Sequence, residues 1–422
     1  MHIQNSLTLP PQTGEVTGSW LDRLARRVIL RSLEHLSSGE LHLTEGERQR
    51  HFGKPHARFP AVRVQVKHPR FYTRLLLGGT SAAGESYADG DWDTSDLTAV
   101  IRLFAANQGV ADGFDHAVVN VARRGVQRLR HRLRANTHRG SRRNIAAHYD
   151  LSNDFFKLWL DKRMMYSSAL YANGARDLET ASTAKLARLT ELLELRPGMR
   201  VLEIGSGWGG LAIYLASMAD VEVVTTTISR AQFEEATARV KSAGLEGRVT
   251  VLEKDYRDLP GTYDRIISVE MVEAVGDDFV DGYFHKVHDL LRPGGRFVMQ
   301  AITIQDQRYR AALKDVDFIK QHIFPGSFIP SVTRLVGAAS TTPSLRLVQL
   351  DDLGLDYART LAAWSDRFAA ARAKLLKLGY GDYFQRLWQF YFSYCAGGFA
   401  ERAISDVHAV FIKSPEAFQA DV

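Results

Sequence analysis

Two glutamates and one glutamine are the first residues of the chain whose types and spacing could do chemistry. Glu270 and Glu273 stand three positions apart in VEMVEAVG, and Gln300 interrupts the apolar run RFVMQAIT after a Pro-Gly-Gly turn. A carboxylate in an apolar setting can remove a proton, and an amide can donate a hydrogen bond to an anion. These residues therefore outline a proton-removing site with acids on one rim and an amide opposite.

The same three residues also have ordinary explanations. A glutamate at the start of a helix is stabilised by the helix dipole, which would account for Glu273. Glu270 follows a strand and could simply contact a cofactor or solvent. A buried Gln300 must either find backbone partners or face a cavity. Of the three, Glu273 is the strongest catalytic candidate.

A glycine turn forms the second candidate site. The run VLEIGSGWGG places Gly205 and Gly207 between a predicted strand and a predicted helix, where a tight turn lets the backbone approach a ligand. Dinucleotides and S-adenosylmethionine both use such turns. Glu203 favours S-adenosylmethionine, because a carboxylate there can orient its ammonium group, and the next strand ends in VVTTTIS without the acid that holds an NAD ribose. Asp255 and Tyr256, after the third strand, can meet an adenine ring.

Alternating strands and helices from about residue 144 must position both sites. Strand-like runs such as RVLEI, VEVVTTTI, YDRIISVE and RFVMQAIT alternate with helix-like runs such as GLAIYLASM and RAQFEEATARVKSAG. This order predicts an α/β fold with a mainly parallel sheet and helices on both faces. Near the end, DYFQRLWQFYFSYCAGGFAERAIS predicts a helix dense in aromatic residues, which are either core or the wall of a long apolar tunnel. VHAVFIKS predicts a last strand.

The chain divides into three predicted parts. Residues 1–115 form a small α+β domain, residues 116–143 a basic linker or helix, and residues 144–422 the larger domain. Within the first part, WLDRLARRVILRSLEHL predicts an amphipathic helix whose apolar stripe includes Leu21 and Val28. TSDLTAVIRLFAANQ predicts a second, capped helix. ELHLTE, VRVQVKHP and FYTRLLLGG predict short strands or a strand-to-helix join.

Composition narrows the class of protein. The 422 residues carry a net charge of +6, and 45% of them are hydrophobic, which supports packed cores. The one cysteine, Cys395, excludes a disulfide framework and disfavours a thiolate metal centre, so we expect no metal. No apolar run reaches the roughly 18 residues that span a bilayer. The first residues lack the order of a signal peptide, so we expect a cytoplasmic protein.

One segment concentrates positive charge. No acidic residue occurs from His116 to Tyr149, while arginines crowd between Arg123 and Arg143. A solvated helix, an anionic membrane surface or a nucleic acid would each explain this segment. No nucleic-acid-binding motif accompanies it, so we expect no nucleic-acid partner.

Seven ordered motifs make the chain resemble a known family. They are AAHYDLSNDFFKLWLDKRMMYSSALY, VLEIGSGWGGLAIYLA, TTTISRAQFEEA, DYRDL, MVEAVG, IFPGSFIPSV and DYARTLAAW. Together they resemble cyclopropane-fatty-acyl-phospholipid synthases and related fatty-acyl methyltransferases. The resemblance runs from about residue 50 to the C-terminus. It implies a Rossmann-like class I methyltransferase domain with a smaller N-terminal α+β domain, which is a candidate for lipid docking.

The resemblance also implies a mechanism and site residues. An acyl double bond attacks the methyl group of S-adenosylmethionine, and a bound bicarbonate removes a proton from the resulting cation. The residues implied around the base are Ser168, Glu273, Gln300, the backbone near Ile302, and Tyr357. Those implied for the cofactor pocket are Tyr166, Ser167, Glu203, Gly205, Gly207, Thr227, Ile228, Gln232, Asp255 and Tyr256.

Four positions depart from the synthases. Ser168 replaces the usual cysteine, Gln300 and Ala274 replace histidines, and Glu270 replaces a glycine. A serine and an amide still donate hydrogen bonds, but a second carboxylate repels a nearby anion. Either bicarbonate is held more weakly, or a protein carboxylate replaces it. The pattern resembles the methyl-branching relatives more than the ring-forming ones, and both products stay open.

The sequence thus predicts an enzyme of acyl-chain methylation. The expected partners are a membrane phospholipid with an unsaturated acyl chain and an anionic membrane surface, with the protein peripheral on the inner face of the membrane. A homodimer and a partner reductase, which would convert a methylene branch to a methyl branch, stay open. The alternatives are an S-adenosylmethionine-dependent methyltransferase acting on a small molecule or RNA, and a non-catalytic lipid-binding protein.

Overall fold

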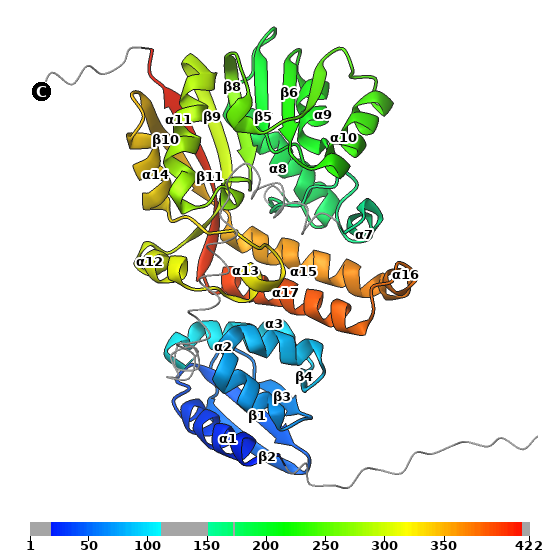
Figure 1. The fold of residues 1–422 in the computed structure, drawn as a ribbon, viewed down its shortest axis with the longest axis vertical. Helices are drawn as coiled ribbons and strands as arrows, with labels where there is room; N and C mark the ends of the chain where they lie inside the picture. The colour runs from blue at the N-terminus through cyan, green and yellow to red at the C-terminus, as the bar shows by residue number, and fades with distance from the viewer. Residues whose placement is uncertain (1–17, 111–150, 172–173, 416–422) are drawn as a thin grey trace, which may run out of the picture.

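The structure is a computed structural model that describes residues 18–110, 151–171 and 174–415. The predicted basic segment at residues 116–143 lies outside these ranges. Figure 1 shows three layers along the long axis: a large sheet with its helices, a layer of C-terminal helices, and the N-terminal elements.

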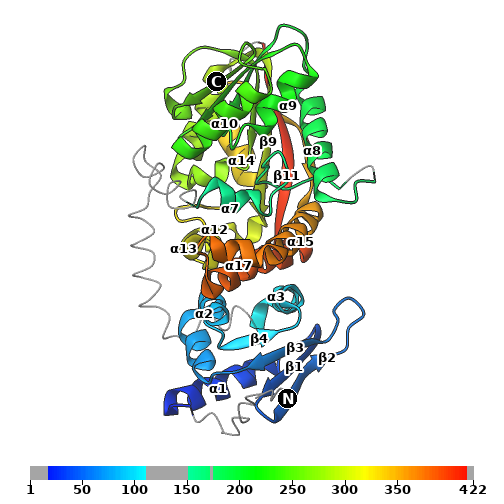
Figure 2. The ribbon, with the colours of Figure 1, turned by 90° about the vertical axis from the view of Figure 1, so that its right-hand side faces the viewer.

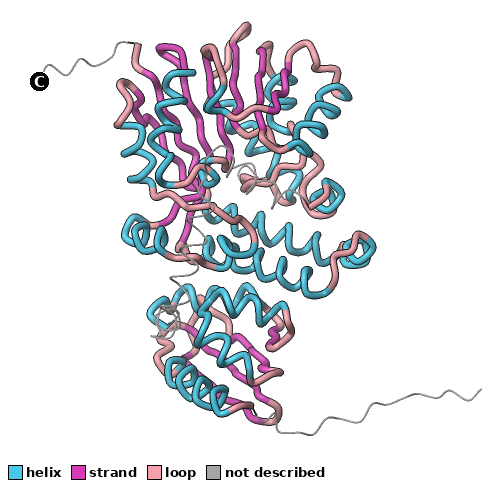
Figure 3. Tube along the Cα trace, viewed as in Figure 1, coloured by secondary structure: helices cyan, strands magenta, loops and turns pink. Residues whose placement is uncertain are grey.

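A seven-stranded sheet organises the larger part of the chain (Figure 3). Its strands, in spatial order, are β10 (Leu345–Asp352), β11 (Ile404–Lys413), β9 (Leu291–Ile304), β8 (Tyr263–Val269), β5 (Arg200–Ile204), β6 (Glu222–Thr227) and β7 (Val249–Glu253). The pairs from β9 to β7 are parallel, while β11 runs antiparallel to both of its neighbours. The expected, mainly parallel sheet is confirmed. Strand β10 was not predicted, and its apolar residues do not mark a single face, because Val348 and Leu350 are exposed while Leu345 is buried.

Helices cover both faces of this sheet because its strands are apolar on both sides. On β5, Val201 belongs to one core cluster, while Leu202 belongs to the other. Successive side chains of a strand point to opposite faces, so both faces must be covered. The first cluster includes residues of α8 (Leu178–Leu193), α9 (Gly210–Met218) and α10 (Arg230–Ser242). The second includes residues of α11 (Val280–Leu290) and α14 (Val332–Ser340).

The helical layer lies beneath the sheet (Figures 1 and 2). It contains α15 (Gly354–Ala370), α16 (Arg372–Lys377) and α17 (Asp382–Ala400), with the short helices α7 (Asn153–Lys157), α12 (Asp306–Lys314) and α13 (Phe318–His322) nearby. Most of the aromatic residues predicted for α17 are buried in one large apolar cluster, although Tyr383 is exposed. Within the described ranges, no helix combines the length and apolar composition needed to cross a bilayer.

The N-terminal elements form a four-stranded sheet with three helices. The strand order is β2 (Arg48–Lys54), β1 (Gly39–Glu45), β3 (Val62–Val66) and β4 (Trp92–Thr94). The helices are α1 (Trp20–Leu33), α2 (Arg70–Ala88) and α3 (Leu97–Ala106). The FYTRLLLGG run is the start of α2, kinked at Gly79, where φ is 58°. Arg386 on α17 donates to the Tyr87 carbonyl at 2.7 Å, tying these elements to the helical layer.

The first helix differs from its prediction in one way that bears on function. Ala25 and Ile29 are buried as expected, but Leu21 and Val28 are 46% and 43% exposed. The buried side of α1 packs against the sheet and α2, and this side is too narrow to include every apolar position. The helix therefore presents apolar side chains on two faces.

Candidate active site

The glycine turn joins β5 to α9 at the carboxyl edge of the sheet. Gly205 has a φ of 98° and Gly207 a φ of 49°, backbone conformations that side-chain-bearing residues rarely adopt. The N–H groups of Gly205 and Ser206 both donate to the Thr226 carbonyl, at 3.0 and 2.9 Å, which anchors the turn to β6. A side chain added at Gly205 would also crowd Met271. The turn is thus open on its ligand side and fixed on its sheet side.

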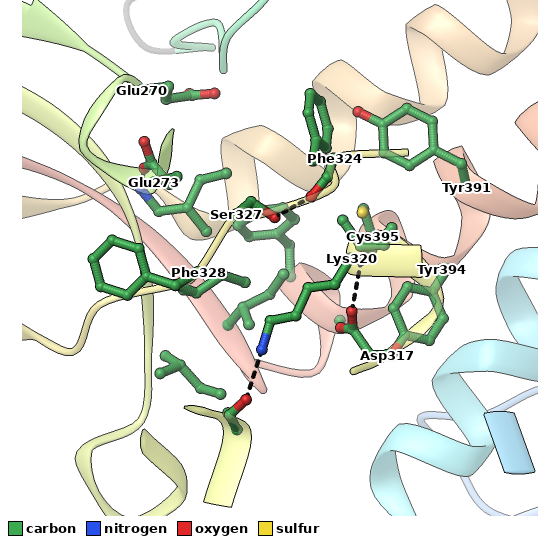
Figure 4. Close-up of a pocket in the computed structure, with 18 of the residues that line it drawn as sticks. Glu270, Glu273, Asp317, Lys320, Phe324, Ser327, Phe328, Tyr391, Tyr394 and Cys395 are labelled. Atoms are coloured by element: carbon green, nitrogen blue, oxygen red, sulfur yellow. Dashed lines mark hydrogen bonds between the residues drawn. The ribbon is translucent and has the colours of Figure 1, made fainter. Parts of the chain in front are cut away.

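One cavity of about 1020 Å³ contains the glycine turn and the two glutamates. All ten residues predicted for the cofactor pocket line it: Tyr166, Ser167, Glu203, Gly205, Gly207, Thr227, Ile228, Gln232, Asp255 and Tyr256. Figure 4 shows another part of the cavity, where Glu270 and Glu273 face the rings of Phe324 and Tyr391 and the thiol of Cys395. The cavity continues to N-terminal side chains, among them Leu41, Val64 and Phe71.

Polar side chains near the turn fit a ligand with a cationic group. Glu203 is buried at the end of β5, and its Oε2 accepts a 2.5 Å hydrogen bond from the Thr225 hydroxyl. Burial raises the pKa of Glu203 to about 8, against the lowering effect of that bond. A bound ammonium would relieve this cost by pairing with the carboxylate. The buried acid thus suits the ammonium group of S-adenosylmethionine.

The Glu270 carboxylate is held by three donors. Its Oε1 accepts from the Ser168 N–H at 2.7 Å and from the Gln300 side-chain amide at 2.8 Å. Its Oε2 accepts from the Tyr357 hydroxyl at 2.7 Å. Glu270 directly follows β8 with a left-handed φ of 47°, and its N–H donates to the Gln300 carbonyl at 2.8 Å. The donors therefore come from three separate parts of the chain and meet on one side chain.

Each donor is fixed from behind. Gln300 lies on β9 beside His408 of β11, whose Nε2 is 3.1 Å from the Gln300 Oε1, and its amide also donates to Asp406 at 2.9 Å. The segment carrying Ser168 is tied to α15, because the Ala169 N–H donates to the Thr360 hydroxyl at 3.0 Å. These contacts orient the Gln300 amide with its NH₂ group toward the carboxyl oxygens of Glu270 and Asp406.

Tyr357 is fixed by packing. Its ring stacks on Phe399 with 4.3 Å between centroids and meets Trp364 edge to face. Tyr357 therefore both packs beside Trp364 and contacts the Glu270 carboxylate. Burial raises the pKa of Tyr357 well above its ordinary value, so the phenol keeps its proton and donates.

Glu273 has a different setting. It lies in a short turn (Val272–Ala274), and its Oε1 accepts from the Ile302 N–H at 2.6 Å. Its Oε2 is buried and has no hydrogen-bond partner among the described residues. Burial, together with the charge of Glu270, raises the pKa of Glu273 to about 8. Glu273 is therefore mostly a neutral acid near pH 7 in the unliganded site.

A buried lysine balances the charge of the site. Lys185 on α8 is fully buried, and its ammonium donates to the Ser167 hydroxyl at 2.6 Å. Burial lowers its pKa, while Glu270 and Asp406 raise it. Burial and the neighbouring Glu270 raise the pKa of Asp406 well above its usual range. Burial raises the pKa of Glu270 too, while its three donors and the charge of Lys185 lower it, so of these close carboxyls Glu270 is the one best stabilised as an anion.

The structure brings the predicted catalytic residues together, in two layers. Glu270, Glu273 and Tyr357 line the cavity. Ser168 and Gln300 do not, and lie behind Glu270 instead. The Ser168 hydroxyl donates to the Ala169 carbonyl, so this residue contacts Glu270 through its backbone only. Gln300 was expected either to bond to the backbone or to face the cavity. Most of its hydrogen-bond partners are instead buried side chains.

Three buried charged or polar residues were missed: Lys185, Asp406 and His408. Lys185 had a signal, since it falls on the apolar stripe of its helix between Ser182 and Leu189. Asp406 and His408 interrupt the apolar strand β11. A polar residue within an apolar run of a central strand is usually buried and hydrogen-bonded. In the described part of the chain, one group, Glu40, His42 and His51, could hold a metal ion, and none of its members lines the cavity.

Comparisons with known proteins show which family the chain is similar to. The family model for mycolic acid cyclopropane synthetase matches residues 136–410. A cyclopropane-fatty-acyl-phospholipid synthase of Escherichia coli is 39% identical over 84% of this chain and 88% of its own. A tuberculostearic acid methyltransferase of Mycobacterium tuberculosis is 36% identical over 77% of each chain.

A solved structure supports the fold. A mycolic acid cyclopropane synthase complexed with SAH and CTAB superposes with a TM-score of 0.60 at 29% identity. The match covers 64% of this chain and 98% of that one. The expected Rossmann-like class I methyltransferase fold is confirmed.

Proposed function

This chain belongs to the mycolic acid cyclopropane synthetase family, and on that premise we propose how it acts and on which substrate. It is an S-adenosylmethionine-dependent enzyme that transfers a one-carbon unit to the double bond of an unsaturated acyl chain. We propose that the acyl chain belongs to a membrane phospholipid, as the name of the Escherichia coli relative says of that protein. The product is a cyclopropane or a methylene-branched chain, and a reductase would turn the latter into a methyl branch.

The continuity of the cavity carries this proposal. The cradle for the methyl donor, the two glutamates and a long apolar wall all belong to one space. Its volume lies at the upper end of the roughly 300–1,000 Å³ usual for ligand sites, which suits two ligands better than one. An acyl chain can enter along the apolar wall and bring its double bond to the glutamates. The predicted aromatic helix thus serves as core and as tunnel wall.

The chain's own residues supply binding, orientation and exclusion of water. S-adenosylmethionine, when bound, supplies a methyl group already activated for transfer. Glu203 pairs with its ammonium, and the glycine turn admits its body. The rings of Tyr166, Phe324 and Tyr391 line the cavity, and the Tyr166 and Tyr391 hydroxyls lie 3.0 Å apart. Aromatic faces stabilise a cation and keep water from it.

Methyl transfer to vesicles tests the proposal. Purified protein is given methyl-labelled S-adenosylmethionine and vesicles of either monounsaturated or fully saturated phosphatidylglycerol. Label should enter the monounsaturated lipid only, with a mass gain of one CH₂ on the acyl chain. Ozonolysis then separates a methylene branch, which is cleaved, from a cyclopropane, which is not. Label on RNA or a small molecule, and none on lipid, would overturn the proposal.

The first helix supports docking on an anionic membrane. Trp20, Leu24 and Val28, four positions apart, are 64%, 47% and 43% exposed and form one apolar stripe. Arg23, Arg27 and Arg31 are also exposed, share the same spacing and border that stripe. An apolar face flanked by arginines is typical of a helix that lies in the interface of an anionic bilayer.

The inner side of the same helix links this surface to the cavity. Ile29 and Leu33, on the buried side of α1, line the cavity at its N-terminal end. A bilayer on the outer face of α1 would thus lie one helix away from the apolar space. We propose that α1 holds the enzyme at the membrane surface while an acyl chain enters.

A further inference from the structure

We infer that the Glu270 carboxylate is the general base of the reaction and that the chain needs no dissolved anion, such as bicarbonate, for proton removal. This inference rests on the proposed function, since it names the group that completes the same reaction. The alternative is that Glu270 is structural and only positions its neighbours.

The three donors around Glu270 form an anion site. A backbone N–H, a side-chain amide and a phenol converge on the two carboxylate oxygens at 2.7 to 2.8 Å. Each of the three donates, because reversing the amide would turn Gln300 Oε1 toward the Ser168 carbonyl and the carboxyl oxygens of Glu270 and Asp406. A site built wholly of donors binds a negative charge. Here the chain itself supplies that charge, and Glu270 occupies the space that a small anion would need.

The backbone of Glu270 adopts a left-handed conformation, which costs free energy for a residue with a side chain. Its φ of 47° is a conformation that glycine adopts readily and that other residues rarely adopt. The cost is offset by the bond from the Glu270 N–H to Gln300 and by the three bonds to the carboxylate. Strained residues that are held by many contacts cluster at functional sites. A purely structural carboxylate could be supplied from an unstrained position.

The location of Glu270 suits a base. It lines the cavity beside Met271, whose side chain lies against Gly205 of the cofactor turn. The carboxylate is thus next to the place where the methyl group is delivered. Glu273 is less suited, because burial and the nearby charge of Glu270 keep it mostly protonated. Burial raises the pKa of Glu270 as well, but the hydrogen bonds from Tyr357, Ser168 and Gln300 oppose that rise. The charge of Lys185, fully buried behind Ser167, also favours the ionised form of Glu270.

The proposed reaction has a methyl-transfer step followed by proton removal by Glu270. The π electrons of the acyl double bond form a bond to the methyl carbon while the methyl–sulfur bond breaks, leaving S-adenosylhomocysteine and a cation on the other alkene carbon. Glu270 then takes a proton from the added carbon. The freed C–H electron pair closes a cyclopropane ring, or forms a methylene double bond if a hydride has first moved the cation to the branched carbon. The proton on Glu270 returns to solvent after the product leaves.

Anion dependence of the unaltered protein is the first test. Methyl transfer to monounsaturated vesicles is measured in carbon-dioxide-free buffer with and without added bicarbonate. The rates should agree within about twofold, since removing a general base would cost about 100-fold or more. A rate that collapses without bicarbonate would overturn the inference. This measurement needs no variant and so does not depend on folding.

Removing the carboxylate is the second test. Glu270→Gly suits the left-handed backbone and empties the anion site, and Glu270→Gln keeps the size without the charge. Both should slow methyl transfer about 100-fold in anion-free buffer. Formate or bicarbonate should restore at least a tenth of the rate to Glu270→Gly but not to Glu270→Gln. The matched control is Glu191→Gln, because Glu191 is an exposed glutamate of α8.

Binding measurements separate this inference from the proposed function. Formate should raise the melting temperature of Glu270→Gly, without any methyl donor present, and leave the unaltered protein unchanged. S-adenosylmethionine should bind all variants with Kd values within about threefold. Full activity of Glu270→Gly in anion-free buffer would reject the base role while leaving the function intact. No binding of S-adenosylmethionine by the unaltered protein would reject the function itself.

Discussion

The Tyr357 hydroxyl donates a 2.7 Å hydrogen bond to the Glu270 carboxylate across 87 positions of sequence. Tyr357 belongs to α15 in the helical layer, and Glu270 directly follows β8 of the sheet. The bond therefore joins two layers at the wall of the cavity that both of them line. The candidate base is complete only when the C-terminal helices have packed against the sheet.

Removing this donor should move the pH profile of the enzyme. Tyr357→Phe deletes one hydrogen bond to an ionised group, worth about 1.5–3 kcal/mol, and so raises the pKa of Glu270 by about one to two units. As the pH falls, Glu270 is then protonated, and so inactive as a base, at a higher pH than in the unaltered protein. The acidic limb of the rate profile therefore shifts to higher pH. Lys185, Asp406 and Glu273, which also act on Glu270, stay in place. Tyr383→Phe on α17 is the control, and an unchanged limb in Tyr357→Phe would contradict the role assigned to Tyr357.

Glu273 should make the folded protein less stable as the pH rises. Its pKa is raised from 4.5 to about 8 by burial and by Glu270, so the folded state holds a proton that the unfolded state has lost. Stability contributed by that proton is complete below about pH 4.5 and is lost as the pH rises through about 8. Glu273→Gln should remove this slope, on the order of a few kcal/mol. Denaturant unfolding from pH 5 to pH 9 measures the difference between the two proteins, and parallel curves would refute it.

Glu203 should govern affinity for the methyl donor. Glu203→Gln removes the negative charge expected to pair with the ligand ammonium, at a cost of about 1.5–3 kcal/mol. The Kd for S-adenosylmethionine should therefore rise about 10- to 100-fold in titration calorimetry. The control is Glu222→Gln, because Glu222 is an exposed glutamate on the neighbouring strand β6. A Kd within twofold of the original would remove Glu203 from the ligand site.

The outer face of α1 should bind anionic bilayers. Replacing Arg23, Arg27 and Arg31 by glutamine should weaken sedimentation with phosphatidylglycerol vesicles by on the order of 100-fold, since each arginine contributes about 1 kcal/mol. Trp20→Ser with Leu24→Ser should weaken binding at all salt concentrations, whereas the arginine effect should fade in high salt.

A matched control distinguishes binding by the α1 surface from non-specific binding by exposed apolar side chains. Met218→Ser alters an apolar side chain that is 63% exposed at the end of α9, in the sheet layer. Binding should not change in this variant. If the α1 variants bind vesicles as the unaltered protein does, another surface holds the membrane. If they change the oligomeric state instead, α1 is an interface between copies of the chain.

The local pattern of the sequence was enough to predict the sheet and to place the glycine turn at its edge. Strands with two apolar faces require helices on both sides, and a glycine turn after such a strand opens at the carboxyl edge. Residues within one motif, such as Gly205 and Gly207, are therefore positioned by their own strand and helix and do not depend on the packing of distant segments. The same local logic failed for β10, which lies at the sheet edge and exposes the apolar residues Val348 and Leu350.

The chemistry of the base depended on packing between distant segments. The resemblance placed Gln300 and Tyr357 in one site and marked Glu270 as a departure from the family pattern, but it left open whether a dissolved anion or a protein carboxylate fills the site. Only the tertiary structure turns the Ser168 N–H toward Glu270, sets His408 beside Gln300 through strand register, and buries Lys185 behind them. Hydrogen bonds between residues more than 80 positions apart follow from how layers pack, which no single motif encodes. The reaction class was therefore determined by the sequence itself, and the identity of the proton acceptor by the fold.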